Sequence, residues 1–462
     1  MLSAISVEDH AHAESMLPRF FPAAHAFLLA LAFLVALAGF RTFPDVMQFG
    51  FTPEFLRIAE TSELEGHFRE ALASQKGIVI DAIRRAPLYP FALIFSNRVL
   101  GSYEALRYVQ FAALVLSFYL WGLAARAFLG WATALCFFVL LLGAAAPPFY
   151  ASVLYPYTFQ YLLASLAYLS LIYGLQRRTA GLVALAGLFA GLAMYEQATH
   201  LFLPAFVCSG LLIFRYRLRI DWRRPLLFVL IAYVTASPWL LRSASLGSFG
   251  MNAKLGYALG WTYGHLKTSS PTAPYARRFD QLVHRHDSDI GTLLFIEEQI
   301  GREGSTYAQA DRKVVSIVVE KMRENPRHVV RSIQQNLRGF PSGLVNLKAT
   351  FLYADGHPPF ARWFLEFVRG RVSILDWVVF FAFIPGTVLA WRVRPAFALV
   401  SASIVTYTML TTIPLVRFYD NRYRGFAGAI ILLLAAHLFV SGVTRLYLRM
   451  RRNTRGDLSV NS

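Results

Sequence analysis

Residues Arg215–Arg242 read RYRLRIDWRRPLLFVLIAYVTASPWLLR, a cluster of arginines followed by an apolar run without charge that ends at another arginine. A helix needs about 20 apolar residues to cross the hydrocarbon core of a bilayer, and fewer where flanking arginines reach the lipid head groups. Connections on the cytoplasmic side are enriched in Lys and Arg. The stretch therefore predicts a membrane-spanning helix over residues 225–242 that starts in the cytoplasm and ends outside.

The composition of the whole chain is typical of an integral membrane protein. Of its 462 residues, 56% are hydrophobic and only 16% are charged, whereas a soluble protein of this length would expose far more charge. Much of the formal net charge of +18 comes from short basic clusters beside apolar runs, where arginines set topology and contact lipid head groups. We therefore expect membrane lipids as partners and no nucleic acid.

The same criterion, applied along the whole chain, predicts ten spans. They cover residues 24–41, 105–125, 131–146, 157–175, 180–195, 198–214, 225–242, 373–391, 396–413 and 425–446. When the N-terminus is placed in the cytoplasm, every short arginine cluster between spans falls on the cytoplasmic side, as the positive-inside rule requires. The prediction is an all-α polytopic protein of the plasma (inner) membrane with both termini in the cytoplasm.

Two long polar segments, 42–104 and 246–372, then face outward. The first contains a run over residues 91–100 that is too short to cross the membrane and is predicted to be a helix at the interface. The second carries apolar stripes at helical spacing, broken at Asn325-Pro326, which predicts an ordered helical subdomain. The predicted organisation is an N-terminal transmembrane module (1–245), an outer helical subdomain (246–372) and a C-terminal transmembrane module with a basic tail (373–462).

Three short phrases lie on the predicted outer side, the first within the outer segment 42–104 and the other two at the outer ends of the seventh and tenth spans. They are Arg85–Pro90 (RAPLYP), Pro238–Arg242 (PWLLR) and Asn421–Arg424 (NRYR). In this order the phrases resemble the membrane-embedded GT-C glycosyltransferases, in the branch around dolichyl-phosphate-mannose–protein mannosyltransferases and bacterial lipid A aminoarabinose transferases. The resemblance implies a GT-C-like bundle of about ten transmembrane helices. It also implies transfer of a sugar from a polyprenyl-phosphate donor to a cell-envelope acceptor on the outer face.

The resemblance further implies roles for particular residues. Enzymes of this family use an acidic residue of the first outer segment to activate or orient the acceptor, and Asp45 and Glu54 are the candidates here. The donor phosphate would be held by outer arginines, namely Arg84, Arg85, Arg242, Arg422 and Arg424. Possible residues of the substrate cavity are Tyr89, Glu196, His200 and Tyr423.

Other interpretations of the sequence stay open. Glu196 and His200 would be ordinary polar residues if the short connection between the fifth and sixth spans were an exposed turn. A transporter or flippase of lipid-linked intermediates is the alternative function, although most charges lie at helix ends and not in mid-helix. A non-catalytic member of the same fold is a third possibility, because Phe51 stands where family members commonly carry Asp. We predict no metal site from the residues and no cofactor, since the lipid-linked sugar donor is a substrate; dependence on a metal ion stays open.

Overall fold

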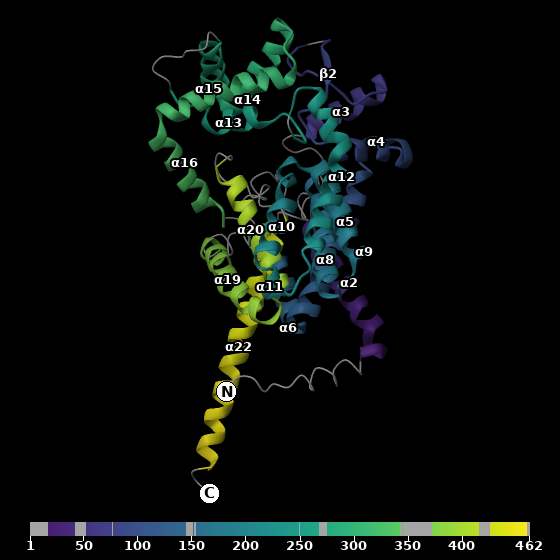
Figure 1. Cartoon of the computed structure of the whole chain (residues 1–462), viewed down its shortest axis with the longest axis vertical. Helices are drawn as coiled ribbons and strands as arrows, with labels where there is room; N and C mark the ends of the chain where they lie inside the picture. Colours follow the sequence, from purple (N-terminus) through teal and green to yellow (C-terminus); the bar gives the residue numbers. More distant parts are fainter. Residues whose placement is uncertain are drawn as a thin grey trace.

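The computed structural model describes residues 17–41, 52–75, 77–144, 151, 154–248, 250–267, 275–341, 344, 372–414 and 426–459. Each of the ten runs predicted as a span contains a helix. These helices are α2 (Leu17–Arg41), α5 (Leu106–Leu129), α6 (Trp131–Gly143), α8 (Tyr157–Gln176), α9 (Ala180–Glu196), α10 (Leu203–Ile213), which follows the 3-10 turn η1 (Ala198–His200), α12 (Arg223–Ser245), α19 (Val372–Val393), α20 (Pro395–Thr412) and α22 (Ala427–Ser459). They form a bundle with a helical head at one end (Figure 1).

Among the described residues, six helices are long and apolar enough to cross a membrane. They are α5, α8, α12, α20 and the apolar parts of α19 (Ile374–Val393) and α22 (Ala427–Arg449). Shorter apolar helices of the bundle include α6, with 13 residues, and α9, with 17. The chain is thus an all-α, multi-pass membrane protein.

Close packing of small residues fixes the position of α9 in the bundle. A methyl group added at Gly187 would lie 2.6 Å from the carbonyl oxygen of Phe228, and one at Gly191 would lie 2.6 Å from that of Ala232. Only glycine therefore lets α9 approach α12 this closely, as small residues do between membrane helices in general. The other side of α9 packs against α8. This packing holds the C-terminal end of α9, which carries Glu196, at a fixed place.

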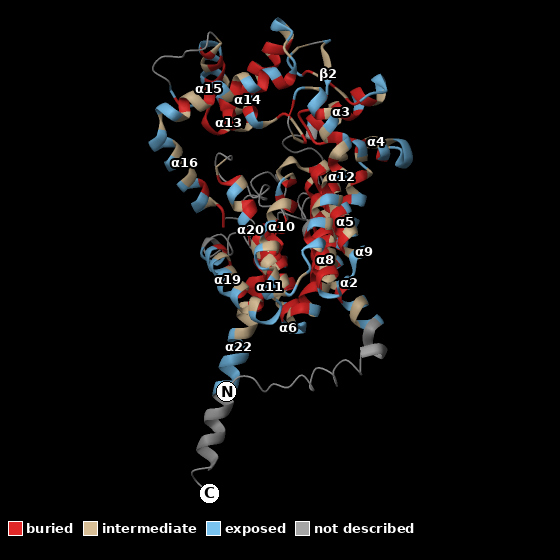
Figure 2. Ribbon diagram, viewed as in Figure 1, coloured by how far each residue is buried: buried red, intermediate tan, exposed pale blue. Residues whose placement is uncertain are grey.

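The head consists of segments from both predicted outer regions. From the first come α3 (Thr52–Glu65), the antiparallel strands β1 (Arg69–Ala71) and β2 (Val79–Asp81), and α4 (Leu88–Leu100). From the second come α13 (Leu255–Tyr263), α14 (Ala276–Glu303), α15 (Tyr307–Glu324) and α16 (Pro326–Gly339). Figure 2 colours parts of α13, α14 and α15 as buried. Phe279, Phe295 and Ile317 belong to a hydrophobic core there that is separate from that of the bundle.

Several of these outer elements confirm expectations from the sequence. The helix predicted over 91–100 is present as α4, although it begins three residues earlier, at Leu88. The break predicted at Asn325-Pro326 separates α15 from α16. The hairpin of β1 and β2 is an element that the sequence did not predict. The remainder of the second outer segment, from residue 345 to 371, lies outside the described residues.

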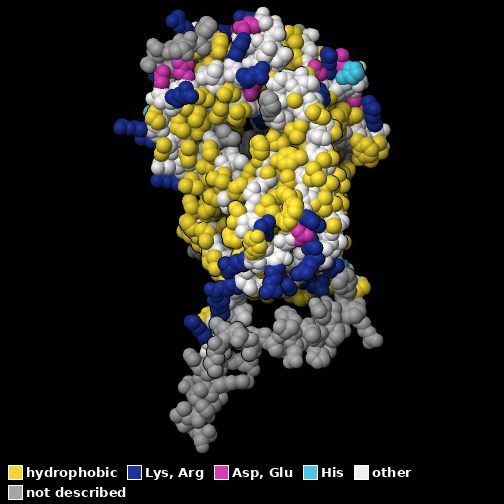
Figure 3. Space-filling model, in the orientation of Figure 1, with side chains coloured by type: hydrophobic (Ala, Val, Ile, Leu, Met, Phe, Trp, Pro, Cys, Tyr) yellow, Lys and Arg dark blue, Asp and Glu magenta, His cyan; other side chains and the backbone are white. Residues whose placement is uncertain are grey.

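On the face drawn in Figure 3, the surface divides into three zones along the bundle axis. Apolar side chains cover the middle of the molecule, and Lys and Arg gather at the end away from the head. The short helix α11 (Arg215–Leu218) lies at this basic end (Figure 1). The head carries side chains of both signs. A basic border on one side of an apolar band is the distribution that the positive-inside rule describes.

Candidate functional site

A cavity of about 360 Å³ lies where the head meets the bundle, and its volume is within the usual range for ligand sites. Six segments that are distant in sequence contribute to its lining: α3, the residues just before α4, the start of α8, the end of α9 with η1, α13 with the loop leading into it, and the end of α20. Aromatic side chains make up much of the wall, namely Phe55, Tyr155, Tyr157, Tyr257, Trp261 and Tyr407.

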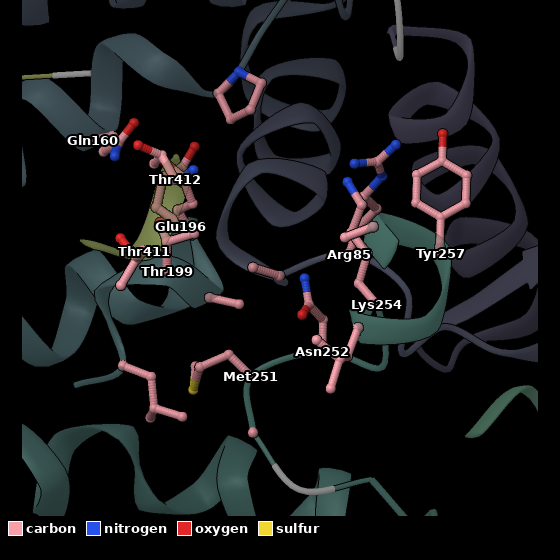
Figure 4. A pocket seen from close by; sticks show the side chains of 18 of the residues that line it. Arg85, Gln160, Glu196, Thr199, Met251, Asn252, Lys254, Tyr257, Thr411 and Thr412 are labelled. Atoms are coloured by element: carbon pink, nitrogen blue, oxygen red, sulfur yellow. The ribbon is translucent and has the colours of Figure 1, made fainter. Parts of the chain in front are cut away.

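One side of the cavity is cationic. Figure 4 shows Arg85, Lys254 and Tyr257 together on this side, with Asn252 close to them. Backbone hydrogen bonding joins the two cationic segments, because the amide of Ala253 donates to the carbonyl of Ile83 at 2.8 Å. Two segments that are far apart in sequence, each carrying a cation, therefore meet here.

The position of Lys254 is fixed by the first turn of α13. The carboxylate of Asp311, on α15, accepts hydrogen bonds from the backbone amides of Gly256 at 2.8 Å and Tyr257 at 2.9 Å. A carboxylate at this end of a helix satisfies free amides and complements the helix dipole. The ammonium of Lys254 lies 5.3 Å from the centre of the Tyr257 ring. Asp311 of the head therefore fixes the backbone next to Lys254 and keeps this residue at the cavity wall.

Arg85 belongs to a buried network of two guanidinium and two carboxylate groups. Its Nε donates to Glu54 Oε2 at 2.7 Å, and its Nη2 pairs with the same oxygen. Arg84 pairs with Glu70 and lies 3.6 Å from Glu54. Burial by itself raises the pKa of Glu54, but the positive charges of Arg85, Arg84 and Lys254 outweigh it and lower that pKa to about 2. Glu54 is therefore a charged carboxylate that anchors Arg85.

The opposite side of the cavity carries oxygen and amide groups. In Figure 4, Glu196, Gln160, Thr199, Thr411 and Thr412 cluster away from Arg85 and Lys254. Glu196 is only 6% exposed, and neither of its carboxylate oxygens has a hydrogen-bond partner among the described residues. The position excludes the exposed turn that was one interpretation of this segment. A buried carboxylate without partners is costly, so this one is a strong functional candidate.

Gln160 links this wall to His200. The Gln160 amide nitrogen lies 2.7 Å from Nε2 of the buried His200 imidazole, whereas the Gln160 carbonyl oxygen has no partner within the described part of the chain. The two neighbouring polar residues Glu196 and Gln160 thus both present unused acceptors. Such a wall suits a ligand that brings several hydroxyl groups.

Comparisons with known proteins add no relative. No family model matches the chain, and no curated protein is similar to it. The GT-C resemblance therefore depends on the ordered sequence phrases alone.

Three other residues predicted for the site lie in the structure but not at the cavity. Arg242, at the end of α12, donates to the carbonyl oxygens of Ala82 at 3.2 Å and Phe68 at 3.1 Å, and thereby holds the hairpin. Arg84 is enclosed beside Glu70. Tyr89 is buried, and its hydroxyl donates to Gln110 at 2.8 Å. These contacts favour structural roles, because each of the three side chains already bonds another part of the protein and does not line the cavity.

Four other predicted residues lie outside the described part of the chain, and the structure adds cavity residues that were not predicted. Asp45, Arg422, Tyr423 and Arg424 lie outside the described residues. Cavity residues that sequence reasoning missed include Lys254, Asn252, Gln160, Thr199, Thr411 and Thr412. Lys254 carried a usable signal, since it is a single cation just before an apolar helix. The threonines carried none, because threonine is common in membrane helices.

Proposed function

We propose that the chain is a membrane glycosyltransferase that moves a sugar from a polyprenyl-phosphate donor to a cell-envelope acceptor on the outer face. The observation that carries the proposal is the cavity at the junction of head and bundle, with Arg85 and Lys254 on one side and the hydroxyl-rich wall of Glu196 on the other. In this proposal the bundle is GT-C-like, its ten helices all cross the plasma membrane, and the basic end is cytoplasmic.

The depth of the cavity suits a lipid-linked substrate. It lies at the head-side ends of α8, α9 and α20, just beyond the apolar band of the surface. A polyprenyl tail would remain among the apolar surfaces of the bundle while its phosphate reached the cavity. The exposed apolar side chains of the bundle, such as Leu230, Val234 and Leu241 on α12, provide such surfaces.

The cationic wall suits the phosphate of the donor. When the sugar is transferred, the bond between its anomeric carbon and the phosphate oxygen breaks, and the phosphate leaves with the electron pair. Lys254 and Arg85 would stabilise this developing charge, and cations held in advance do so without reorganisation. The buried Glu54 keeps Arg85 in place for this task.

The aromatic lining suits the sugar ring. Tyr257 and Trp261 lie on the α13 side of the cavity and Tyr155 and Tyr157 on the α8 side. Flat rings pack against the apolar faces of sugars, while neighbouring amides and hydroxyls bind the sugar hydroxyl groups.

Deletion of the gene tests the proposal whichever sugar is transferred. Loss of the transferase should leave a polyprenyl-phosphate sugar accumulated in the lipid extract, visible by mass spectrometry, and should remove one linkage from the envelope glycans. A Lys254→Met variant should reproduce both effects, and the control Lys313→Met, in the head but away from the cavity, should reproduce neither. Unchanged lipids and glycans after deletion would refute the proposal.

A flippase of lipid-linked intermediates is the second candidate, because Glu196 is an ionisable side chain buried at the end of a predicted span. The two functions differ in reconstituted vesicles. A flippase would move a labelled polyprenyl-phosphate sugar across the bilayer in the absence of acceptor. The transferase would leave its distribution unchanged and would consume it only when an acceptor is present.

A further inference from the structure

We infer that Glu196 is the catalytic residue that takes the proton of the acceptor during transfer, an assignment that rests on the proposed function. The acidic candidates expected from the family resemblance lie in the first outer segment. Glu54, the one within the described residues, is already bound by Arg85 and does not line the cavity. Glu196 does line it, from the opposite side to the cations.

Glu196 lacks the hydrogen-bond and ion-pair partners that several other buried carboxylates have. Glu54 and Glu70 pair with guanidinium groups. Asp311 accepts from two backbone amides, and Glu297 accepts from the amide of Ser74 at 2.8 Å. Within the described part of the chain, Glu196 has both oxygens unbonded. A carboxylate already stabilised by a cation is a weak base, whereas an unpaired one can receive a proton readily.

The backbone beneath Glu196 is rigid. Gly187 and Gly191 lock α9 against α12, and the hydroxyl of Tyr195 donates to the carbonyl of Thr235 at 3.1 Å. The Cα of Glu196 is therefore held at the cavity wall. A functional group held on a rigid element in advance is what efficient proton transfer requires.

The arrangement of the two walls defines the step. The donor phosphate lies against Lys254 and Arg85, and the acceptor hydroxyl lies against Glu196 with the sugar between them. The acceptor oxygen forms a bond to the anomeric carbon while the bond from that carbon to the phosphate oxygen breaks. The acceptor proton passes to Glu196, and the electron pair of the broken bond leaves on the phosphate. Gln160 and Thr199, beside Glu196, are placed to bind other hydroxyl groups of the same ligands.

The test compares Glu196→Gln with Glu63→Gln, a control whose carboxylate bonds Asn97 and Tyr103 away from the cavity. Purified proteins are first assayed for binding of undecaprenyl phosphate by native mass spectrometry. Transfer is then measured with the donor lipid purified from deletion cells and with membranes of those cells as acceptor. Glu196→Gln should bind undecaprenyl phosphate within about twofold of the wild type and should transfer at least about 100-fold more slowly. Glu63→Gln should match the wild type in both.

A Glu196→Ala variant separates proton transfer from a structural role. Loss of the side chain leaves room for formate, and formate at high concentration should restore part of the transfer rate, by about tenfold or more. A wild-type rate in Glu196→Gln, a change confined to the KM for the acceptor, or absence of rescue by formate would each overturn the assignment. In those cases normal binding and transfer by the wild type would leave the proposed function standing. Absence of transfer by the wild type itself would instead reject that function.

Discussion

Replacement of Glu54 by Gln should destabilise the protein, because it leaves two buried guanidinium groups with one carboxylate. Glu54 is 8% exposed and accepts two hydrogen bonds from Arg85. Removal of one partner of a buried ion pair costs about 3–5 kcal/mol. The pKa of Glu54, lowered from 4.5 to about 2, independently gives roughly 3 kcal/mol for stabilisation of the charged form. The two figures agree within their precision.

The pH dependence follows from the direction of this pKa shift. A carboxylate whose pKa is lower in the folded state stabilises the protein above its unfolded pKa and loses that contribution as the pH falls. The difference between wild type and Glu54→Gln should therefore be full at pH 7. It should begin to shrink below about pH 4.5, the ordinary value, and be largely gone near pH 2.

Thermal unfolding of the purified proteins in one detergent, followed between pH 7 and pH 3, measures this difference. We expect the Tm of Glu54→Gln to lie at least about 5 °C below that of the wild type at pH 7. Glu60→Gln is the matched control, because Glu60 lies on the exposed side of the same helix α3. An equal Tm for wild type and Glu54→Gln at pH 7, or a difference that does not change with pH, would refute the reasoning.

Three further substitutions test the framework around the cavity. Gly191→Ala should lower the Tm, at a cost of about 1–3 kcal/mol, since the added methyl would meet the Ala232 carbonyl at 2.6 Å; Gly181→Ala, with open space around it, should not. Equal values for the two would contradict the close packing of α9. Arg242→Gln should make the hairpin more sensitive to limited proteolysis, and unchanged cleavage would show that its two carbonyl contacts are dispensable. Thr306→Ala removes a capping box, so we expect faster amide hydrogen exchange in the first turn of α15 and a loss of about 1 kcal/mol; unaltered exchange would argue against the cap.

The bundle could be predicted from sequence because the bilayer imposes a simple local rule. Runs of about 20 apolar residues must be helical in lipid, so the positions of the bundle helices do not depend on distant contacts. The break before Pro326 was predictable from local rules as well, because the residue before a proline disfavours helical dihedral angles and proline is favoured at the first position of a new helix. The hairpin was not, because strands of three residues carry too little periodicity to be distinguished from a loop.

The cavity could be predicted only in part because its walls come together through tertiary contacts. Glu196 and Arg85 were both candidates, yet nothing local indicated that Glu54, 31 residues before Arg85, would pair with that arginine and hold it at the cavity. Tertiary contacts also decide between the roles of Arg242 and Lys254. Both are single cations beside apolar segments, but one bonds backbone carbonyls and the other reaches the cavity.

A cryo-electron microscopy structure with undecaprenyl phosphate bound is the most direct test of the claim that this cavity is the donor site. We predict phosphate density on the cationic side, with oxygens about 2.7–3.2 Å from the Lys254 ammonium and the tail leaving toward the apolar band. The same structure of the Lys254→Met variant should lack that phosphate density, because the ammonium that binds the phosphate is absent. Phosphate bound instead at the basic end of the bundle, beside Arg215 and Arg223, with the cavity unoccupied, would contradict the account.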